Sequence, residues 1–519
     1  MPPIPAEQLI GLARPVSSGL ARAGAPSLGA RLLNVLAHRV PEPRLKADLL
    51  AEAAELELSH GLAPRRLKTA YAAQLVCADA LFKEGKKAAA AAAAADALIL
   101  AFHRVPHLDG LTSPLAEDPE GFTAALRRSR TLRAVAKPRG RAEAAVTPPD
   151  DRPHRLLIVN RGNANFLPLI TGRYEAHPEA EVRTLDMATD PDLAPLAKGL
   201  GRMMARAVGS QAAYGRAAEQ ALRPHLDWAD TVFVDWCSVG AAFLTMVDPG
   251  TTRVVVRLHS YEALGYWPHV MDFSRVDDLL FVSPHVRDLT TAAVPRLLAE
   301  DAPRLHVIHN AMDLSAYRRA KRPDARFTLG LVGTGQVAKD PRWAVEVLRL
   351  LRRHDERYRL LLVGSGLDAE SSPAVRRYHD ALERDLAKLE PSGAVRRIGQ
   401  TDDVPGALEE VGIILSTSVR ESFHCGLVEG AASGAVPVVR DWPFFAGREH
   451  GARTLFPQDW VVGTPEEAAR RILAVTATEE TWQKTGQAAA ELALAAWDWN
   501  VVRDDFDRLL LGARRNTAA

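Results

Sequence analysis

Two successive series of short apolar runs constrain the fold of this chain more than any other sequence feature. The runs are rich in Val, Ile and Leu, and helical stretches separate many of them. Continuous apolar runs of this length are typical of parallel strands buried on both faces, and alternation with helices predicts an α/β fold. The first series covers residues 155–159, 231–234, 253–256, 279–282 and 306–308; the second covers residues 327–332, 358–363, 394–398, 412–415 and 435–439. We therefore expect two Rossmann-like, doubly wound domains facing a cleft, with ligands at the carboxyl ends of the strands.

The region before the first series predicts an all-α N-terminal domain. Ala, Leu, Arg and Glu dominate residues 1–135, and Pro or Gly interrupts them at intervals. Residues 136–153 contain four prolines and mixed charge, which predicts a linker. The expected domains are 1–135 (helical), 154–316 (first Rossmann-like domain) and 317–495 (second Rossmann-like domain), followed by a C-terminal helical segment, 496–519.

Charge and cysteine content exclude several classes of protein. Lys and Arg number 65 against 64 Asp and Glu, whereas a protein whose main function is nucleic-acid binding carries a clear basic excess. Cys77, Cys237 and Cys425 lie far apart, so we expect neither a disulfide framework nor a metal site. The N-terminus lacks the segments of a signal peptide, and the Ala-rich run 88–102 contains Asp96 and is too short to span a bilayer. These features predict a cytoplasmic protein.

The most informative motif is a pair of glutamates eight positions apart. Glu421-Ser-Phe-His-Cys-Gly-Leu-Val-Glu429 precedes a run of small residues and an apolar strand. If a helix begins near Gly426, its free N–H groups face the cleft and can hold an anion. Glu429 is then placed to accept hydrogen bonds from a ribose diol, while Glu421 faces the group beyond the phosphates. The alternative interpretation is two surface glutamates beside a helix start.

This stretch resembles the E-x7-E motif of retaining glycosyltransferases with two Rossmann domains (the GT-B fold), especially the family 4-like group, glycosyl transferases group 1. The resemblance implies that Glu421 acts at the donor sugar as a catalytic residue and that Glu429 binds the ribose of the nucleotide. It also assigns the residues between them to the donor site: Phe423, His424, Cys425, Gly426 and Leu427.

A second loop resembles the phosphate loop of the same family. Gly333-Thr334-Gly335 follows a strand, and Lys339 precedes the next helix. The resemblance implies that Lys339 pairs with the donor diphosphate and stabilises the charge on the leaving nucleotide. Thr334 stands where the family has Arg, so one of two expected cations is missing, and Arg161 from the first domain is a candidate to compensate. Gly399, after another strand, is included in the expected donor site.

In the first domain, the resemblance assigns a catalytic role to His259, which ends a strand where the family commonly has a His that reaches the donor sugar. The loop of residues 160–165, with Arg161 and Gly162, takes the place of the glycine-rich first loop of the family and is expected to bind the donor. Ser283, at another strand end, is expected to line the cleft.

Three further stretches complete the resemblance. Asn310 and Asp313 match the segment that joins the two domains, and we interpret them as structural hinge residues. Residues 497–506 resemble the terminal helix signature of the family, which implies a C-terminal helix that crosses back to the first domain. Trp442, Phe444 and Phe445 either shape the sugar pocket or pack in the core.

The resemblance implies a retaining hexosyltransferase that uses a nucleotide-diphosphate sugar and no metal ion or other cofactor. The acceptor stays open between a saccharide, a lipid-linked molecule, a protein and a small molecule. Peripheral membrane association and oligomerisation through the helical domain also stay open, and no nucleic-acid partner is expected. The alternatives are a catalytically degenerate GT-B protein acting as a binding or scaffold subunit and a sugar-nucleotide epimerase. A nucleophilic role for Cys425 is disfavoured because no base is identifiable beside it.

Overall fold

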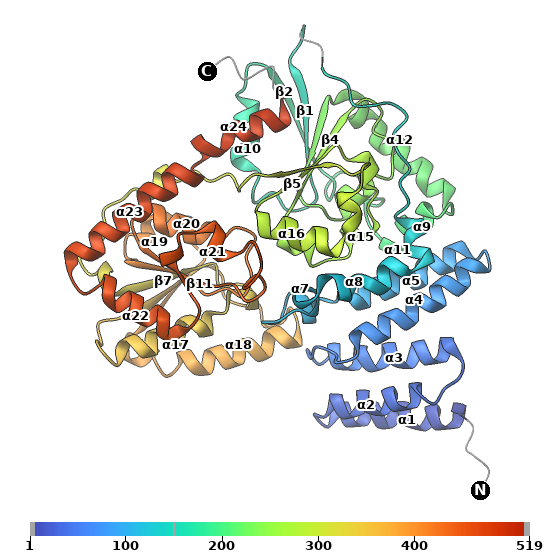
Figure 1. The fold of residues 1–519 in the computed structure, drawn as a ribbon, viewed down its shortest axis with the longest axis horizontal. Helices are drawn as coiled ribbons and strands as arrows, with labels where there is room; N and C mark the ends of the chain where they lie inside the picture. The colour runs from blue at the N-terminus through green and yellow to red at the C-terminus, as the bar shows by residue number, and fades with distance from the viewer. Residues whose placement is uncertain (1–5, 149–150, 513–519) are drawn as a thin grey trace.

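The computed structural model describes residues 6–148 and 151–512. Two expectations fall partly outside the described residues: the absence of a signal peptide, which concerns residues 1–5, and the end of the C-terminal segment, residues 513–519. Figure 1 shows helices at the N-terminus, two α/β domains, and a C-terminal helical segment that runs between these two domains.

The N-terminal region is entirely helical in its described part, as the composition predicts. Consecutive helices α1 to α5 each contact the next one, which makes a chain of helical hairpins (Figure 1). Gly24, Gly61 and Gly85 have positive φ just after helix ends, a conformation that glycine adopts without strain. The helices are α1 (Ala6–Arg22), α2 (Pro26–Ala37), α3 (Pro43–Leu58), α4 (Leu67–Lys83), α5 (Lys87–Ala101), α6 (Arg104–His107), α7 (Pro114–Glu117), α8 (Pro119–Arg128) and α9 (Arg130–Val135).

The Ala-rich run forms helix α5. By length and composition alone, Lys87–His107 could cross a membrane, with a mean hydropathy of 1.4, and it is 56% buried inside the protein. Within the fold α5 packs against α4 and against α11 of the next domain. It therefore contributes to the core shared by the helical domain and the first α/β domain.

The proline-containing segment after α9 runs along the first α/β domain. Arg139 forms an ion pair with Asp272 at 3.2 Å, and Arg141 forms one with Asp277 at 2.5 Å. The Val146 amide donates to the Thr251 carbonyl at 3.1 Å. These bonds anchor the segment along its described length.

The first α/β domain contains a parallel sheet of order β2-β1-β3-β4-β5-β6. Its strands are β1 (His154–Asn160), β2 (Ala180–Asp186), β3 (Thr231–Val234), β4 (Arg253–Leu258), β5 (Asp278–Phe281) and β6 (Arg304–Val307). Its helices are α10 (Pro168–Glu175), α11 (Leu200–Ala207), α12 (Ala212–Trp228), α13 (Val239–Leu244), α14 (Ser260–Ala263), α15 (Trp267–Val270) and α16 (Pro284–Ala293), with short 3-10 helices at Phe273–Arg275 and Pro295–Leu298. The apolar runs predict five of these strands; β2 was missed because it is an edge strand whose residues are largely exposed.

The second α/β domain repeats this arrangement with the order β12-β11-β10-β7-β8-β9, again parallel. Its strands are β7 (Thr328–Val332), β8 (Arg359–Val363), β9 (Val395–Gly399), β10 (Ile413–Ser416), β11 (Val436–Arg440) and β12 (Val461–Val462). Its helices are α17 (Pro341–Arg352), α18 (Pro373–Leu386), α19 (Val404–Leu408), α20 (Cys425–Ala432), α21 (Ala452–Leu455) and α22 (Pro465–Val475), and its 3-10 helices include η5 (Val337–Lys339). The remaining 3-10 helices are η3 (Ser315–Tyr317) in the preceding connection, Ala325–Phe327, Glu390–Ser392 and Gln458–Trp460. The expected fold class, two doubly wound domains behind a helical one, is confirmed.

Two consecutive helices end the described chain. Helix α23 (Glu479–Trp497) packs on the second domain, and α24 (Trp499–Leu510) reaches the first one (Figure 1). Phe506 and Leu509 lie in the same apolar cluster as Leu156 of β1. Arg173 of α10 also forms an ion pair with Asp507 at 2.7 Å.

The helical domain contacts both α/β domains. The Phe102 ring lies 4.8 Å from the His269 ring of the first domain. On the second domain, the Ser372 hydroxyl donates to Asp109 at 2.8 Å and Arg377 donates to the His60 carbonyl at 2.6 Å. The helical domain is therefore a third wall that spans the two α/β domains.

Candidate functional site

The two donor-site motifs meet at the carboxyl ends of β7 and β10. The Lys339 ammonium donates to Oε1 of Glu421 at 2.7 Å, and these side chains are 20% and 9% exposed. Lys339 ends η5, whereas Glu421 lies in the loop between β10 and α20. The Val419 amide donates to the Ala338 carbonyl at 2.8 Å, which joins the two loops. Both residues therefore lie at the edge of the sheet where ligands of parallel α/β domains bind.

Glu421 is contacted from several directions. The Ser418 hydroxyl donates to the same carboxylate oxygen as Lys339, and Nε2 of His424 lies 3.7 Å from it. Burial raises the pKa of Glu421, whereas the neighbouring His424, the Lys339 charge and the hydrogen bonds from Lys339 and Ser418 lower it, and the net effect is a lowered pKa. Its main-chain carbonyl accepts a hydrogen bond from Nε2 of His285, in the first domain, at 3.0 Å. Glu421 is thus an ionised carboxylate at the contact between the two domains.

His424 has a left-handed backbone, with φ of 76° and ψ of 66°, which is uncommon for a residue other than glycine. Its Nδ1 lies 2.7 Å from the Ser416 hydroxyl, which also accepts a hydrogen bond from Nε1 of Trp442 at 3.1 Å. Burial lowers the pKa of His424 to about 3, so the imidazole is neutral at physiological pH. A neutral, buried imidazole therefore stands beside the Glu421 carboxylate.

Helix α20 begins at Cys425 without a side-chain cap, which leaves its first N–H groups for a ligand or solvent. A β-carbon on Gly426 would lie 3.0 Å from Cβ of Val332, so glycine allows the helix start to approach the end of β7. The side chains of Phe423 and Leu427 are fully buried. Because the whole of each residue is buried and the Leu427 amide donates to the His424 carbonyl at 3.1 Å, the expectation that these two residues contact a donor needs correction.

Glu429 lies one turn into α20 and contacts the connection between the domains. The Tyr317 hydroxyl is hydrogen-bonded to its carboxyl group. Burial raises the pKa of Glu429, and this effect exceeds the opposing effects of Tyr317 and of the Lys339 charge. Burial also raises the pKa of Cys425 to about 12, and the amide group of Asn310 donates to its sulfur at 3.7 Å. Cys425 is therefore a protonated thiol, which does not suit a nucleophile.

Three glycines with positive φ lie at the carboxyl ends of β7, β8 and β9. They are Gly333 (79°), Gly364 (113°) and Gly399 (78°). The Gly333 amide donates to the Val363 carbonyl at 2.8 Å, and the Gly364 amide donates to the Gly399 carbonyl at 2.7 Å. A β-carbon on Gly364 would lie 3.4 Å from Cα of Gly333. Here the backbones of neighbouring loops pack directly against each other, which explains the glycines.

Thr334 supplies no charge to this loop. Its hydroxyl donates to the Ser365 carbonyl at 3.2 Å, and the residue is 6% exposed. Arg440, a cation from the end of β11, is paired with Asp340 at 2.7 Å. Gly335, next to Thr334, is exposed.

The first domain brings His259 to the same place. His259 follows β4 and is 2% exposed. The hydroxyl of the next residue, Ser260, accepts a hydrogen bond from the Ser422 hydroxyl at 2.8 Å. The Ser260 amide donates to the Ser422 hydroxyl oxygen at 2.9 Å. Because Ser422 follows Glu421, the catalytic histidine and glutamate expected from the sequence are each one residue from this contact.

Arg161 and Gly162 are held within the first domain. Nε of Arg161 donates to the Ala197 carbonyl at 2.9 Å, and the Gly162 amide donates to Asp186 at 2.8 Å. Gly162 has a φ of 73°. Both residues follow β1, at the carboxyl edge of its sheet.

One further expectation needs correction, and one open alternative is decided. Ser283 was expected to line the cleft, but it is fully buried and its hydroxyl bonds to His285 at 3.1 Å, because it begins α16 inside the domain. Trp442, Phe444 and Phe445, for which a sugar pocket and core packing were both open, are at most 5% exposed and belong to the core. The sequence did not single out Tyr317, Ser418 or Trp236, whose importance lies in contacts between distant residues.

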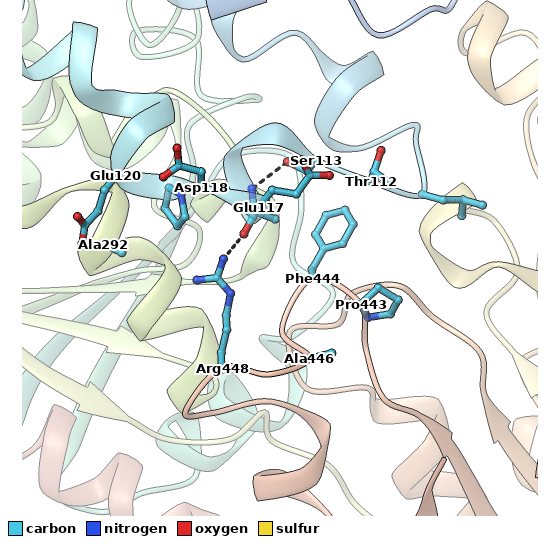
Figure 2. Close-up of a pocket in the computed structure, with 13 residues that line it drawn as sticks. Thr112, Ser113, Glu117, Asp118, Glu120, Ala292, Pro443, Phe444, Ala446 and Arg448 are labelled. Carbon is cyan, nitrogen blue, oxygen red and sulfur yellow. Dashed lines mark hydrogen bonds between the residues drawn. The ribbon is translucent and has the colours of Figure 1, made fainter. Parts of the chain in front are cut away.

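A separate cavity of about 590 Å³ lies where the three domains meet (Figure 2). Glu117, Asp118 and Glu120 from the helical domain line it together with Phe444 and Arg448 of the second domain. The Arg448 guanidinium donates to the Ala116 carbonyl across this junction. Across residues 6–148 and 151–512, no group of three or more His, Cys, Asp and Glu residues is arranged to hold a metal ion.

Comparisons with known proteins agree with this geometry. Residues 326–477 match the model of the family described as "Glycosyl transferases group 1". The structure of Anabaena HepE in complex with UDP is similar at 16% identity, with 69% of this chain and 100% of that chain covered and a TM-score of 0.51. A trehalose-6-phosphate synthase structure is similar at 13% identity, with 69% and 98% covered and a TM-score of 0.51. The chain has the GT-B fold.

The likeness to the TarM structure is weaker. The match has 12% identity and a TM-score of 0.43, and it covers 57% of this chain and 58% of the TarM chain. No curated protein matches this sequence. The family match covers the second α/β domain, which contains Lys339, Glu421 and Glu429.

Proposed function

We propose that this protein is a retaining glycosyltransferase that moves a hexosyl group from a nucleotide-diphosphate sugar to an acceptor hydroxyl without a metal ion. The observation that carries the proposal is the contact between Lys339 and Glu421 beside the uncapped start of α20. A cation, a carboxylate and free N–H groups are the groups that a diphosphate and its sugar require. The family match of the second domain and the similarity to HepE, whose structure contains UDP, support a nucleotide-sugar donor.

Each charged residue has a distinct role in this proposal. Lys339 and the N–H groups at the start of α20 neutralise the diphosphate, which makes the nucleotide a better leaving group. Glu429 accepts hydrogen bonds from the ribose hydroxyls, and Glu421 orients the sugar. The contact with Glu421 holds Lys339 in position before a diphosphate binds, and the bound diphosphate then shares the lysine with Glu421. His259 contacts the sugar from the first domain.

The reaction forms and breaks bonds on one face of the sugar. The bond between the anomeric carbon and the phosphate oxygen breaks, and the acceptor oxygen bonds to that carbon from the same side. The acceptor proton passes to the leaving phosphate oxygen, so the atoms and charges balance without a protein base. Lys339 and α20 supply the positive charge that stabilises the departing diphosphate, which is the basis for proposing a metal-independent reaction.

A ligand screen followed by a transfer assay tests the proposal. Thermal unfolding is measured with UDP-, GDP-, ADP-, CMP- and TDP-sugars, because a bound ligand raises the apparent stability with its concentration. The matching donor is then incubated with EDTA and candidate acceptors, and the anomeric configuration of the product is read by NMR. We expect an α-linked product from an α-linked donor, and no transfer by Glu429→Ala or Lys339→Ala. Lys484→Ala, which changes an exposed lysine of α23, is the control.

A second candidate is a GT-B protein that binds a nucleotide without transferring the sugar. The observation favouring it is Thr334, which stands where the resembling family has a cation and donates to the Ser365 carbonyl instead. Calorimetry with UDP and a donor-hydrolysis assay separate the two candidates. Nucleotide binding together with the absence of both hydrolysis and transfer would support the scaffold.

A further inference from the structure

Phe166, Trp236 and His259 form an aromatic cluster at the carboxyl ends of β3 and β4. Of these three residues, only His259 has a role in the proposed donor site. The His259 ring lies between Phe166, at a centroid distance of 5.0 Å and an angle of 22°, and Trp236, at 4.3 Å and 32°. Phe166 and Trp236 are both half-buried. The cluster borders the donor site, because Ser260 is hydrogen-bonded to Ser422.

The two outer rings are held by a single buried ion pair. Nε of Arg257 donates to Oδ1 of Asp235 at 2.7 Å, and both side chains are 0% exposed. The same Asp235 oxygen accepts the Trp236 amide at 3.1 Å, while Nη2 of Arg257 donates to the Phe166 carbonyl at 3.2 Å. A buried ion pair is weak evidence of stability, so its value here lies in fixing the positions of the two rings.

Trp236 also has a strained backbone. Its φ of 72° lies in the left-handed region, where a bulky residue is rare. Nε1 of its indole donates to the Asn163 carbonyl at 3.2 Å, which fixes the ring orientation. Strain of this kind persists where the surrounding contacts hold a side chain in a particular place.

The centre of the cluster lacks hydrogen-bond partners. Both ring nitrogens of His259 are buried and have no partner among the described residues. Oε1 of Glu262 lies 3.7 Å from Nδ1, which is beyond hydrogen-bonding distance. Buried polar atoms in native proteins are nearly always paired, so a ligand or water is expected to complete this site.

We propose that Phe166 and Trp236 form the binding site for a pyranose ring of the acceptor, and that His259 between them contacts this ring through one ring nitrogen and the donor sugar through the other. This proposal rests on the proposed glycosyltransferase function and narrows its acceptor to a saccharide. A sugar hydroxyl both donates and accepts hydrogen bonds, so it satisfies either ring nitrogen of His259. The C–H groups of a pyranose pack against aromatic rings such as Phe166 and Trp236.

The same residues do not suit an acceptor that is recognised through a phosphate group. The Arg257 guanidinium, which is the cation of this cluster, is paired with Asp235. The carboxylate of that pair repels an anion, and the remaining members of the cluster are rings without a formal positive charge when His259 is neutral. A neutral sugar ring therefore fits the cluster better than a phosphate does.

Saturation-transfer difference NMR with methyl pyranosides tests the site. The probes are the methyl glycosides of glucose, galactose, mannose and N-acetylglucosamine, each titrated with and without UDP. We expect at least one glycoside to bind, and Trp236→Ala to weaken its affinity about tenfold through loss of ring contact. Trp236→Phe should weaken it less, and this variant carries the test if Trp236→Ala does not fold.

The control variant is Trp228→Phe. Trp228 is a half-buried tryptophan of the same domain that ends α12 before β3, at the opposite edge of the sheet, with Arg183 over its ring. Unchanged glycoside affinity in both Trp236 variants, or binding of glucose 6-phosphate but of no methyl glycoside, would overturn the proposal. UDP calorimetry on the same samples reports on the donor site. If the proposed function is wrong, the unmodified protein will not bind UDP, and this outcome is distinct from a failure to bind glycosides.

Discussion

Lys339 and Glu421 lie 82 positions apart in the chain, yet their side chains meet at 2.7 Å. The lysine ends η5 after β7, and the glutamate follows β10, the neighbouring strand in the sheet. Parallel strands bring their carboxyl ends to one edge, which explains how two short loops form one charged site.

Removing Lys339 should leave the Glu421 carboxylate without its counter-ion. Lys339→Ala is expected to lower the free energy of unfolding by about 2 kcal/mol, because breaking a largely buried pair costs more than replacing both partners. The double variant Lys339→Ala/Glu421→Gln should recover at least half of this loss, while transfer activity stays absent. Urea denaturation of the two single variants and the double variant measures the coupling. Strictly additive effects would contradict a direct pair.

Tyr317→Phe should change the pH dependence of nucleotide binding. Burial raises the pKa of Glu429, while the Tyr317 hydrogen bond and the Lys339 charge lower it; the protonated Cys425 thiol is the other titratable group beside it. Without the hydroxyl, the pKa of Glu429 rises further, so the carboxylate becomes protonated at a higher pH as the pH falls. UDP binding measured by calorimetry between about pH 5 and pH 8 should therefore weaken at a higher pH in the variant. An unshifted midpoint would show that Tyr317 does not act on Glu429.

His424→Gly and His424→Ala should rank opposite to their usual order in helices. Both variants lose the bond to Ser416, but only alanine keeps a β-carbon in the left-handed conformation. We expect the glycine variant to be more stable than the alanine variant by about 1 kcal/mol. Thermal unfolding of the two variants provides the comparison, and a more stable alanine variant would show that the backbone relaxes.

Cys425 should be unreactive in the folded protein. Burial raises the pKa of the Cys425 thiol to about 12, and burial also raises the pKa values of Cys77 and Cys237. Ellman's reagent at pH 8 should therefore modify the native protein slowly and all three thiols rapidly after denaturation. Cys425→Ser should keep transfer activity within about threefold. Rapid modification coupled to loss of activity would argue for a reactive cysteine.

Asp109 should contribute to docking of the helical domain on the second α/β domain. Its carboxylate accepts from Ser372, the N-cap of α18, at 2.8 Å and from Arg104 at 2.7 Å and 2.9 Å. Asp109→Ala is expected to lower the free energy of unfolding by about 1–3 kcal/mol because the buried Ser372 hydroxyl loses its acceptor. Hydrogen exchange should rise at the start of α18. Asp48→Ala, an exposed change in α3, is the control.

Much of the fold could be predicted because buried parallel strands are apolar along their whole length. Runs such as residues 155–159 and 358–363 mark interior strands of the sheets, β1 and β8. Strand β2 alternates half-buried and exposed residues, and β12 pairs over two residues only, so neither has a recognisable pattern.

The candidate site divides in a similar way. Glu421 and Glu429 could be recognised because they lie eight positions apart in one motif, and Lys339 because it follows a glycine-containing loop after a predicted strand. Trp236 and Tyr317 could not be, because each matters through a residue far away in the chain, His259 for the first and Glu429 for the second.

The sequence by itself determined that two α/β domains follow a helical one and which loop carries the paired glutamates. Only the tertiary structure decided that Lys339 contacts Glu421, that Tyr317 contacts Glu429, and that His259 lies between two aromatic rings. The physical reason is that strand and helix patterns reflect local burial, whereas these contacts arise when separate loops converge as sheets and domains pack together.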